Sequence, residues 1–166
     1  MLEIFYPDEY VDTTYQIDFA SLYETGYRGL IFDIDNTLVA HGAKADERAK
    51  ELFARLKKMG FACCLLSNNK EPRVKSFNED VMVEFIFNAR KPSVRNYQEA
   101  MRKLKTDITN TAFIGDQIFT DIYGAKRAGM RSILVKPLHP KEEIQIVLKR
   151  YLEKIVLHFY KKQLKK

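Results

Sequence analysis

The chain has 166 residues, of which 46% are hydrophobic, and it carries a formal net charge of +6 at pH 7. This length is typical of one globular domain, and no apolar run approaches the roughly 18 residues that a membrane-spanning helix needs. The sequence therefore predicts a single soluble domain over residues 1–166. Because the first residues lack the basic start and apolar segment of a signal peptide, we expect a cytoplasmic location.

The positive charge is concentrated at the carboxyl end. Residues 149–166 hold seven Lys or Arg and one acid, Glu153, whereas residues 1–148 hold 21 side chains of each sign. The preferred interpretation is a solvated helix end, where basic residues are favoured. The alternative is a local basic patch that contacts an anionic membrane or another polyanion, and we expect no specific binding of nucleic acid.

Short β-rich runs alternate with helical patterns along the chain. This alternation predicts an α/β fold, a Rossmann-like three-layer sandwich around a central parallel sheet of about five strands. The strands are expected at residues 29–33, 61–66, 84–87, 111–114 and 132–135. The helices are expected at 18–24, at 46–59, from about 72, from 92, up to about 129, and from about 141 to 162. Residues 1–28 give the weakest pattern.

The last expected helix is basic and amphipathic. One apolar stripe runs along it, formed by Ile144, Leu148, Tyr151, Leu152, Ile155 and Phe159. The spacing places these side chains on one face of the helix. We expect this face to pack against the sheet.

Polar side chains follow four of the expected strands at the point where each strand ends. They are Asp33, Asp35 and Thr37 after the first strand, Ser67 and Asn68 after the second, Lys91 after the third, and Asp116 with Asp121 after the fourth. In open α/β sheets, ligands bind beyond the carboxyl ends of the strands. The pattern therefore predicts that these residues form one site.

The residue types in this set suit phosphoryl transfer. Asp33 and Asp116 offer the hard oxygen ligands that Mg²⁺ accepts, and Lys91 can neutralise the transferred group. Ser67 can donate a hydrogen bond to the phosphoryl oxygens. Asp33, at a rigid strand end, is the candidate nucleophile, which would form an aspartyl phosphate. Asp35 can protonate the leaving oxygen and then accept a proton from the attacking water.

Two further residues are candidates for substrate binding. Thr37 and Asn68 lie where they could contact the phosphate. Each has a structural alternative, because Thr37 can hold its own loop together and Asn68 can favour a turn.

Residues 29–135 resemble the haloacid dehalogenase (HAD) superfamily of phosphatases. The resemblance is carried by four motifs in order: Asp33-Ile34-Asp35-Asn36-Thr37-Leu38, then Ser67, then Lys91, then Gly115-Asp116 with Asp121 five residues later. It implies a Mg²⁺-dependent phosphomonoester hydrolase. It also implies that the backbone carbonyl of Asp35 binds the metal, and that Asp121 supports the metal ligands and the lysine.

More narrowly, the motifs are similar to those of the YqeG-like IIIA subgroup and of phosphatidylglycerophosphate phosphatases. The segments 39–46 and 68–90, where the superfamily inserts cap domains, are too short for a large cap. We therefore expect an open site that suits a large or surface-presented substrate, such as a lipid head group at the inner face of a membrane. The alternatives are a soluble small-metabolite phosphatase and a non-catalytic binding module of HAD fold.

Overall fold

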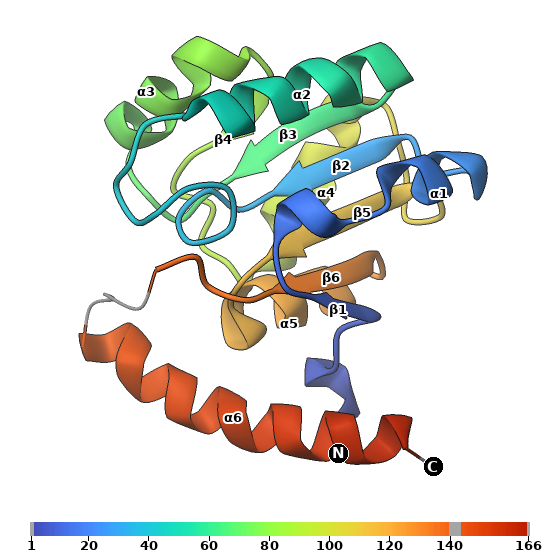
Figure 1. The fold of residues 1–166 in the computed structure, drawn as a ribbon, viewed down its shortest axis with the longest axis vertical. Helices are drawn as coiled ribbons and strands as arrows, with labels where there is room; N and C mark the ends of the chain where they lie inside the picture. Colours follow the sequence, from blue (N-terminus) through green and yellow to red (C-terminus); the bar gives the residue numbers. More distant parts are fainter. Residues whose placement is uncertain (1, 140–143, 166) are drawn as a thin grey trace.

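The computed structural model describes residues 2–139 and 144–165. Its centre is a six-stranded sheet in the order β1-β6-β5-β2-β3-β4, in which every neighbouring pair is parallel (Figure 1). The strands are β1 (Glu9–Val11), β2 (Gly29–Phe32), β3 (Ala62–Leu66), β4 (Glu84–Ile86), β5 (Thr111–Gly115) and β6 (Arg131–Val135). All six carboxyl ends therefore lie at one edge of the sheet.

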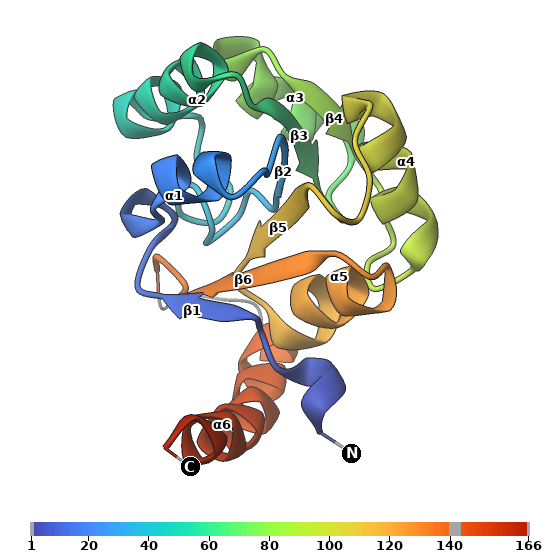
Figure 2. The same ribbon diagram turned by 90° about the vertical axis from the view of Figure 1, so that its right-hand side faces the viewer.

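Helices cover both faces of this sheet (Figure 2). The α-helices are α1 (Phe19–Glu24), α2 (Glu47–Met59), α3 (Glu71–Val81), α4 (Val94–Leu104), α5 (Tyr123–Arg127) and α6 (Ile144–Leu164). The shorter turns are η1 (Glu3–Phe5), η2 (Thr14–Gln16) and the π-helical turn η3 (Ile118–Ile122). One core contains side chains of α1, α2 and α3, and a second contains side chains of α4 and α5. The predicted three-layer α/β sandwich is confirmed.

The central strand β2 shows why the sheet needs both layers. All four of its residues are buried. Because side chains alternate across a strand, Leu30 and Phe32 join the core beneath α1 to α3, whereas Ile31 joins the core beneath α4. A strand with both faces covered is a continuous apolar run, as a parallel sheet requires.

Besides shifts of one or two residues at several element ends, the structure differs from the sequence prediction by one additional strand and by the start of one helix. A sixth strand, β1, pairs with β6 in the register Glu9 with Ile133, and its three half-buried residues were too few to show a pattern. Helix α4 begins at Val94 after Ser93, two residues later than the expected start at Pro92.

The largest correction concerns the last helix. We expected its apolar stripe to pack on the sheet, but Leu148, Tyr151, Leu152, Ile155 and Phe159 are exposed. The expected start near residue 141 and the side chain of Ile144 fall outside the described part of the chain. The other helices already cover both faces of the sheet, and α6 lies beyond the β1 edge, along the bottom of Figure 1.

Helix α6 instead packs through the side opposite its exposed stripe. Among the side chains of α6 that the structure describes, Glu153, Val156 and Tyr160 are buried. Val156 joins a small core with Ile118 and Ile122 of η3, and the Tyr160 ring contacts the Tyr6 ring edge-on at a centroid distance of 5.5 Å. Among the described residues, no helix combines the length and the hydrophobicity that crossing a bilayer requires.

The amino-terminal segment braces the loop that follows β2. The Thr14 hydroxyl donates to the Thr37 carbonyl oxygen at 2.8 Å, and the Tyr15 hydroxyl donates to the Leu38 carbonyl oxygen at 2.6 Å. On the other side, the backbone N–H of Leu138 donates to the Asn36 carbonyl oxygen at 3.1 Å. The loop is therefore held between segments from both ends of the chain.

We expect Thr14→Val to lower the free energy of unfolding by about 1–2 kcal/mol, because it removes a hydrogen-bond donor from a buried carbonyl group. Thr25→Val is the matched control, since the Thr25 hydroxyl bonds the Ser21 carbonyl oxygen at an exposed position where water can replace it. Urea unfolding of both variants measures the difference. Equal stability of the two variants would show that the brace contributes nothing.

Candidate active site

The functional side chains gather at the carboxyl ends of β2, β3 and β5 and in the segment after β4. Lys91 lies at the centre of the group. Its Nζ donates to Asp33 Oδ1 at 2.7 Å and to Asp121 Oδ1 at 2.7 Å, although these residues are 58 and 30 positions away. The predicted convergence of distant strand ends is therefore present in the structure.

Burial makes this ion-pair arrangement strong. The side chains of Lys91, Asp33 and Asp121 are only 3%, 11% and 1% exposed. Burial alone would lower the pKa of Lys91, but the carboxylates of Asp121 and Asp33 outweigh that effect and raise it. Lys91 therefore stays positively charged at neutral pH and can bind an anionic phosphoryl group.

Three buried carboxylates form a compact cluster. One carboxylate oxygen of each of Asp33, Asp116 and Asp121 lies within 4.8 Å of the others. Burial raises the pKa of Asp33 to about 6, despite the attraction of Lys91. Burial, together with repulsion from Asp33 and Asp121, raises the pKa of Asp116 well above its ordinary value. When all three are ionised, these carboxylates outnumber the two cations that bond to them, Lys91 and Arg150.

This donor set fits a magnesium ion. Mg²⁺ prefers oxygen ligands and is usually held by one or two carboxylates together with water. Asp33 and Asp116 can supply the two carboxylates, and the backbone carbonyl of Asp35 follows Asp33 by two residues in the chain. Asp121 Oδ1 accepts from Lys91, and its Oδ2 accepts from the backbone N–H groups of Asp116 and Gln117. Asp33 Oδ2 and Asp116 Oδ1, by contrast, share the one proton of the Thr37 hydroxyl, which leaves them better able to bind an ion. Asp121 therefore suits a supporting position.

The Asp121 carboxylate is held in position against the backbone of Gly115. It lies in the π-helical turn η3, directly after β5. A β-carbon at Gly115 would lie 2.5 Å from Asp121 Oδ2, closer than any side chain tolerates. Glycine before Asp116 therefore lets the carboxylate of Asp121 reach the strand end and accept the two N–H groups.

Asp35 is held by a separate set of donors. Its Oδ1 accepts from the Gly42 backbone N–H at 2.7 Å and from Arg73 Nη2 at 2.8 Å, and its Oδ2 accepts from Asn69 Nδ2 at 2.5 Å. Asn69 also donates through its backbone N–H to Ser67 Oγ at 3.1 Å. The side chains of Asp35 and Ser67 are therefore linked through Asn69.

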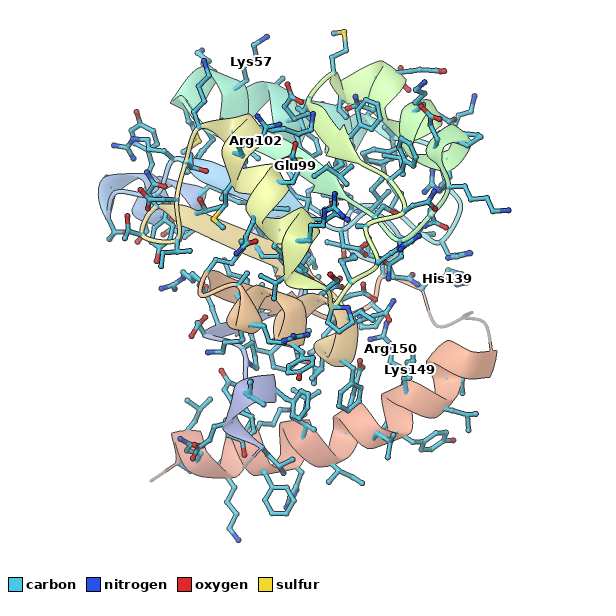
Figure 3. All side chains as sticks on the ribbon, turned by 180° about the vertical axis from the view of Figure 1, so that it is seen from behind. Lys57, Glu99, Arg102, His139, Lys149 and Arg150 are labelled. Carbon is cyan, nitrogen blue, oxygen red and sulfur yellow. The ribbon has the colours of Figure 1, made fainter. Side chains whose placement is uncertain are left out.

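Helix α6 reaches the same cluster through Arg150 (Figure 3). Arg150 Nη2 donates to Asp116 Oδ2 at 2.5 Å, and Nη1 donates to the Asp116 carbonyl oxygen at 2.6 Å. Nη1 also pairs with Glu153 Oε2 at 2.9 Å, and Glu153 Oε1 accepts from the Ile118 N–H at 2.8 Å. These bonds fix the inner side of α6 to the residues that follow β5.

The sequence reasoning missed Arg73, Arg150 and Glu153. Arg73 and Arg150 are single basic residues within helices, and no motif distinguishes them from surface cations. Glu153 did carry a signal, because it is the one acid in the basic segment. A lone acid among cations and apolar residues suggests a buried ion pair.

Comparison with known proteins agrees with a phosphoryl-transfer site at this edge of the sheet. A family model described as HAD-hydrolase-like matches residues 88–137. The protein named "Probable phosphatase YqeG" of Bacillus subtilis (strain 168) is 35% identical over 162 residues, which cover 97% of this chain and 94% of that protein. The chain belongs to the HAD superfamily of phosphatases, as a YqeG-like member.

Two more distant matches agree with this assignment. Phosphatidylglycerophosphate phosphatase 1, chloroplastic/mitochondrial, of Arabidopsis thaliana is 26% identical over 166 residues, covering 90% of this chain and 45% of that protein. The crystal structure of a HAD-superfamily hydrolase from Ehrlichia chaffeensis superimposes with a TM-score of 0.55 at 16% identity. It covers 77% of this chain and 97% of that one, and it supports the fold.

Thr37 and Asn68 have structural contacts within this HAD site. The Thr37 hydroxyl lies 3.1 Å from Asp116 Oδ1 and 3.3 Å from Asp33 Oδ2, and the residue is fully buried. Asn68 Oδ1 accepts from the Lys91 backbone N–H at 2.7 Å. Thr37 thus orients two carboxylates and Asn68 orients Lys91, whereas their predicted contacts with phosphate stay predictions.

The HAD phosphatase has no inserted cap domain in the two expected positions. Residues 33–46 form a loop between β2 and α2, and residues 67–83 contain only α3 and its connections. A cavity of about 360 Å³ opens beside Asp116, between α6 and the end of β6. Its lining includes Ile118, Leu134, Arg150 and Leu157.

We expect Lys91→Met to lower the free energy of unfolding by about 3 kcal/mol or more, because Asp33 and Asp121 would lose their shared buried cation. Lys103→Met is the matched control. Lys103 pairs with Glu84 at 3.3 Å on the surface, where such pairs contribute about 1 kcal/mol or less. Urea unfolding at neutral pH compares the two, and equal destabilisation would contradict the buried ion-pair arrangement.

Proposed function

We propose that this HAD phosphatase is a Mg²⁺-dependent phosphomonoesterase that forms an aspartyl phosphate on Asp33 and acts on a phosphorylated lipid head group. Phosphatidylglycerophosphate is the candidate substrate. The observation that carries the catalytic part is the position of Asp33, whose carboxylate lies at the end of β2 between Lys91 and the other acids while keeping an 11% exposed side chain. A substrate phosphate can reach it from solvent.

The proposed chemistry has two steps. In the first, a carboxylate oxygen of Asp33 attacks phosphorus, the bond from phosphorus to the ester oxygen breaks, and Asp35 donates a proton to that oxygen. Because both oxygens of Asp35 accept hydrogen bonds in this structure, from Gly42, Arg73 and Asn69, the step requires that Asp35 first leaves these donors and takes up a proton from water. In the second, water attacks the phosphorus of the aspartyl phosphate, Asp35 accepts the proton of that water, and inorganic phosphate leaves as Asp33 is regenerated. A bound Mg²⁺ would neutralise negative charge on the phosphoryl oxygens.

The other residues position and neutralise the transferred group. Lys91 presents a cation that two carboxylates keep protonated. Ser67 presents a hydroxyl that can donate to a phosphoryl oxygen, and the Asn69 N–H fixes its oxygen. Because these groups are held before substrate arrives, little reorganisation accompanies the reaction.

Three observations support a lipid head group. The site has no cap that would enclose a small metabolite. The cavity beside Asp116 gives the alcohol portion of a larger substrate a place to lie. The Arabidopsis relative is named for phosphatidylglycerophosphate. On this proposal the enzyme works at the inner face of a membrane as a peripheral protein, with α6 at the lipid surface.

We expect Asp33→Asn to reduce hydrolysis of a generic phosphate ester by at least about a thousandfold, because the amide cannot form the acyl phosphate. Asp80→Asn is the control, since Asp80 is an exposed residue of α3 whose ion pair, among the described residues, is with Lys50 at 3.8 Å. The assay includes phosphatidylglycerophosphate, sugar phosphates, nucleotides and phosphopeptides with Mg²⁺. Inactivity of the unaltered enzyme on all of them would overturn the proposal, and a preference for sugar phosphates would favour a soluble metabolite.

We expect Mg²⁺ to raise the melting temperature of the unaltered enzyme, because a ligand that binds only the folded state stabilises it. Asp116→Asn should lose most of this shift, whereas Asp80→Asn should keep it. Thermal unfolding after treatment with EDTA, followed by titration with Mg²⁺, measures the effect without substrate. An equal Mg²⁺ shift in Asp116→Asn would show that the ion binds elsewhere.

A further inference from the structure

The exposed stripe of α6 is the largest cluster of solvent-facing apolar side chains in the described part of the chain. Six of the nine strongly exposed large hydrophobic residues there lie on α6. Five of them, which we call the outer face, are Leu148, Tyr151, Leu152, Ile155 and Phe159, and they are 44% to 64% exposed. Single exposed apolar residues are ordinary, but a contiguous patch of this kind indicates an interaction surface.

Cations accompany the outer face and acids are missing from it. The exposed lysines of this segment are Lys149, Lys154, Lys161, Lys162 and Lys165, of which Lys161 lies over the Tyr10 ring of β1, with Nζ 5.7 Å from the ring centroid, rather than beside the outer face. Between residues 144 and 165 the one acid is Glu153, which is buried and bonded to Arg150 and to the Ile118 N–H. The solvent side of α6 therefore presents apolar side chains and positive charge without any carboxylate.

We propose that the outer face of α6 is a docking surface for an anionic phospholipid bilayer. A helix with large apolar residues on one face and lysines beside them lies in the interface of such a bilayer, with the apolar side chains among the acyl chains and the lysines near lipid phosphates. Lys154 is an example of a lysine beside an apolar side chain of the outer face. Its Nζ lies 4.9 Å from the centroid of the Tyr151 ring.

A second copy of the chain suits this surface less well. Two outer faces packed against each other would bring the lysines of both helices together, and neither helix has an exposed acid to pair with them. Like charges placed together in this way oppose association. A bilayer that contains anionic lipid buries the same apolar side chains and attracts the lysines.

Docking on this face would also orient the active site. The inner side of α6 is bonded to Asp116 through Arg150, so the catalytic cluster lies on the opposite side of the helix from the outer face. A helix with its side chains is about 10–12 Å across. The site would thus lie about one helix diameter from the lipid phosphates. This step rests on the proposed function, and it requires the head group to reach past α6 to the catalytic cluster.

Sedimentation of the full chain with vesicles tests the docking surface. The vesicles are made of phosphatidylcholine with and without phosphatidylglycerol. We expect binding only to the anionic vesicles, and we expect Leu152→Ser/Ile155→Ser to weaken it by at least about tenfold, because two apolar side chains leave the interface. Met82→Ser/Ile108→Ser removes two exposed apolar residues elsewhere, 80% and 51% exposed against 57% and 54% for Leu152 and Ile155, and should bind as the unaltered chain does.

A second pair of variants tests the charge. Lys154→Gln/Lys165→Gln should weaken binding by about fivefold for each lysine removed. Lys57→Gln/Lys58→Gln is the control, since Lys57 lies at the far end of the molecule from α6 (Figure 3). Equal loss in both pairs would show that net charge alone drives binding, which would overturn a docking surface on α6.

Further outcomes separate this proposal from the proposed function. Failure of the unaltered chain to bind anionic vesicles, with hydrolysis of a water-soluble phosphate ester intact, overturns docking alone. Vesicle binding without any hydrolysis overturns the proposed function alone. A dimer in light scattering that Leu152→Ser/Ile155→Ser dissociates, without vesicle binding, would assign the outer face to a second copy and overturn the bilayer.

Discussion

The site depends on one buried cation that two carboxylates share. Lys91 lies 2.7 Å from both Asp33 and Asp121, in a place where none of the three side chains is more than 11% exposed. Water screens these charges little, so each ion needs the others to offset its desolvation. The same burial raises the pKa of Asp33 to about 6. The proposed nucleophile, the proposed phosphate-binding cation and the proposed metal site thus depend on one constraint.

The fold supplies that constraint by ending four parallel strands at one edge. The short distances between residues far apart in the chain follow from the strand order, which places β2 between β5 and β3. Gly115 allows Asp121 to approach the end of β5, and segments from both ends of the chain hold the loop after β2. Helix α6 adds a bond to Asp116 on one side and an apolar, cationic surface on the other. The catalytic centre and the exposed surface of α6 are thereby joined through Arg150.

The sequence predicted the parts of this arrangement that follow from strand periodicity and motif order. The strands that lead to Asp33, Ser67 and Asp116 are apolar runs with polar ends. They can be recognised in the sequence because both faces of the sheet are covered, so that almost every residue of these strands is buried. It did not predict β1, whose three residues carry no pattern, nor the contacts of Arg73 and Arg150, which depend on how helices pack. The periodicity of the apolar residues correctly predicted one apolar face on α6, but periodicity does not determine whether such a face packs on the sheet or is exposed to solvent.

The most direct test of the shared-cation site is a crystal structure grown with Mn²⁺, whose anomalous scattering locates the ion. The account predicts one strong peak bound by carboxylate oxygens of Asp33 and Asp116, with Lys91 still bonded to Asp121. A peak at another acidic position, or carboxylates of Asp33 and Asp116 too far apart to bind one ion, would contradict it.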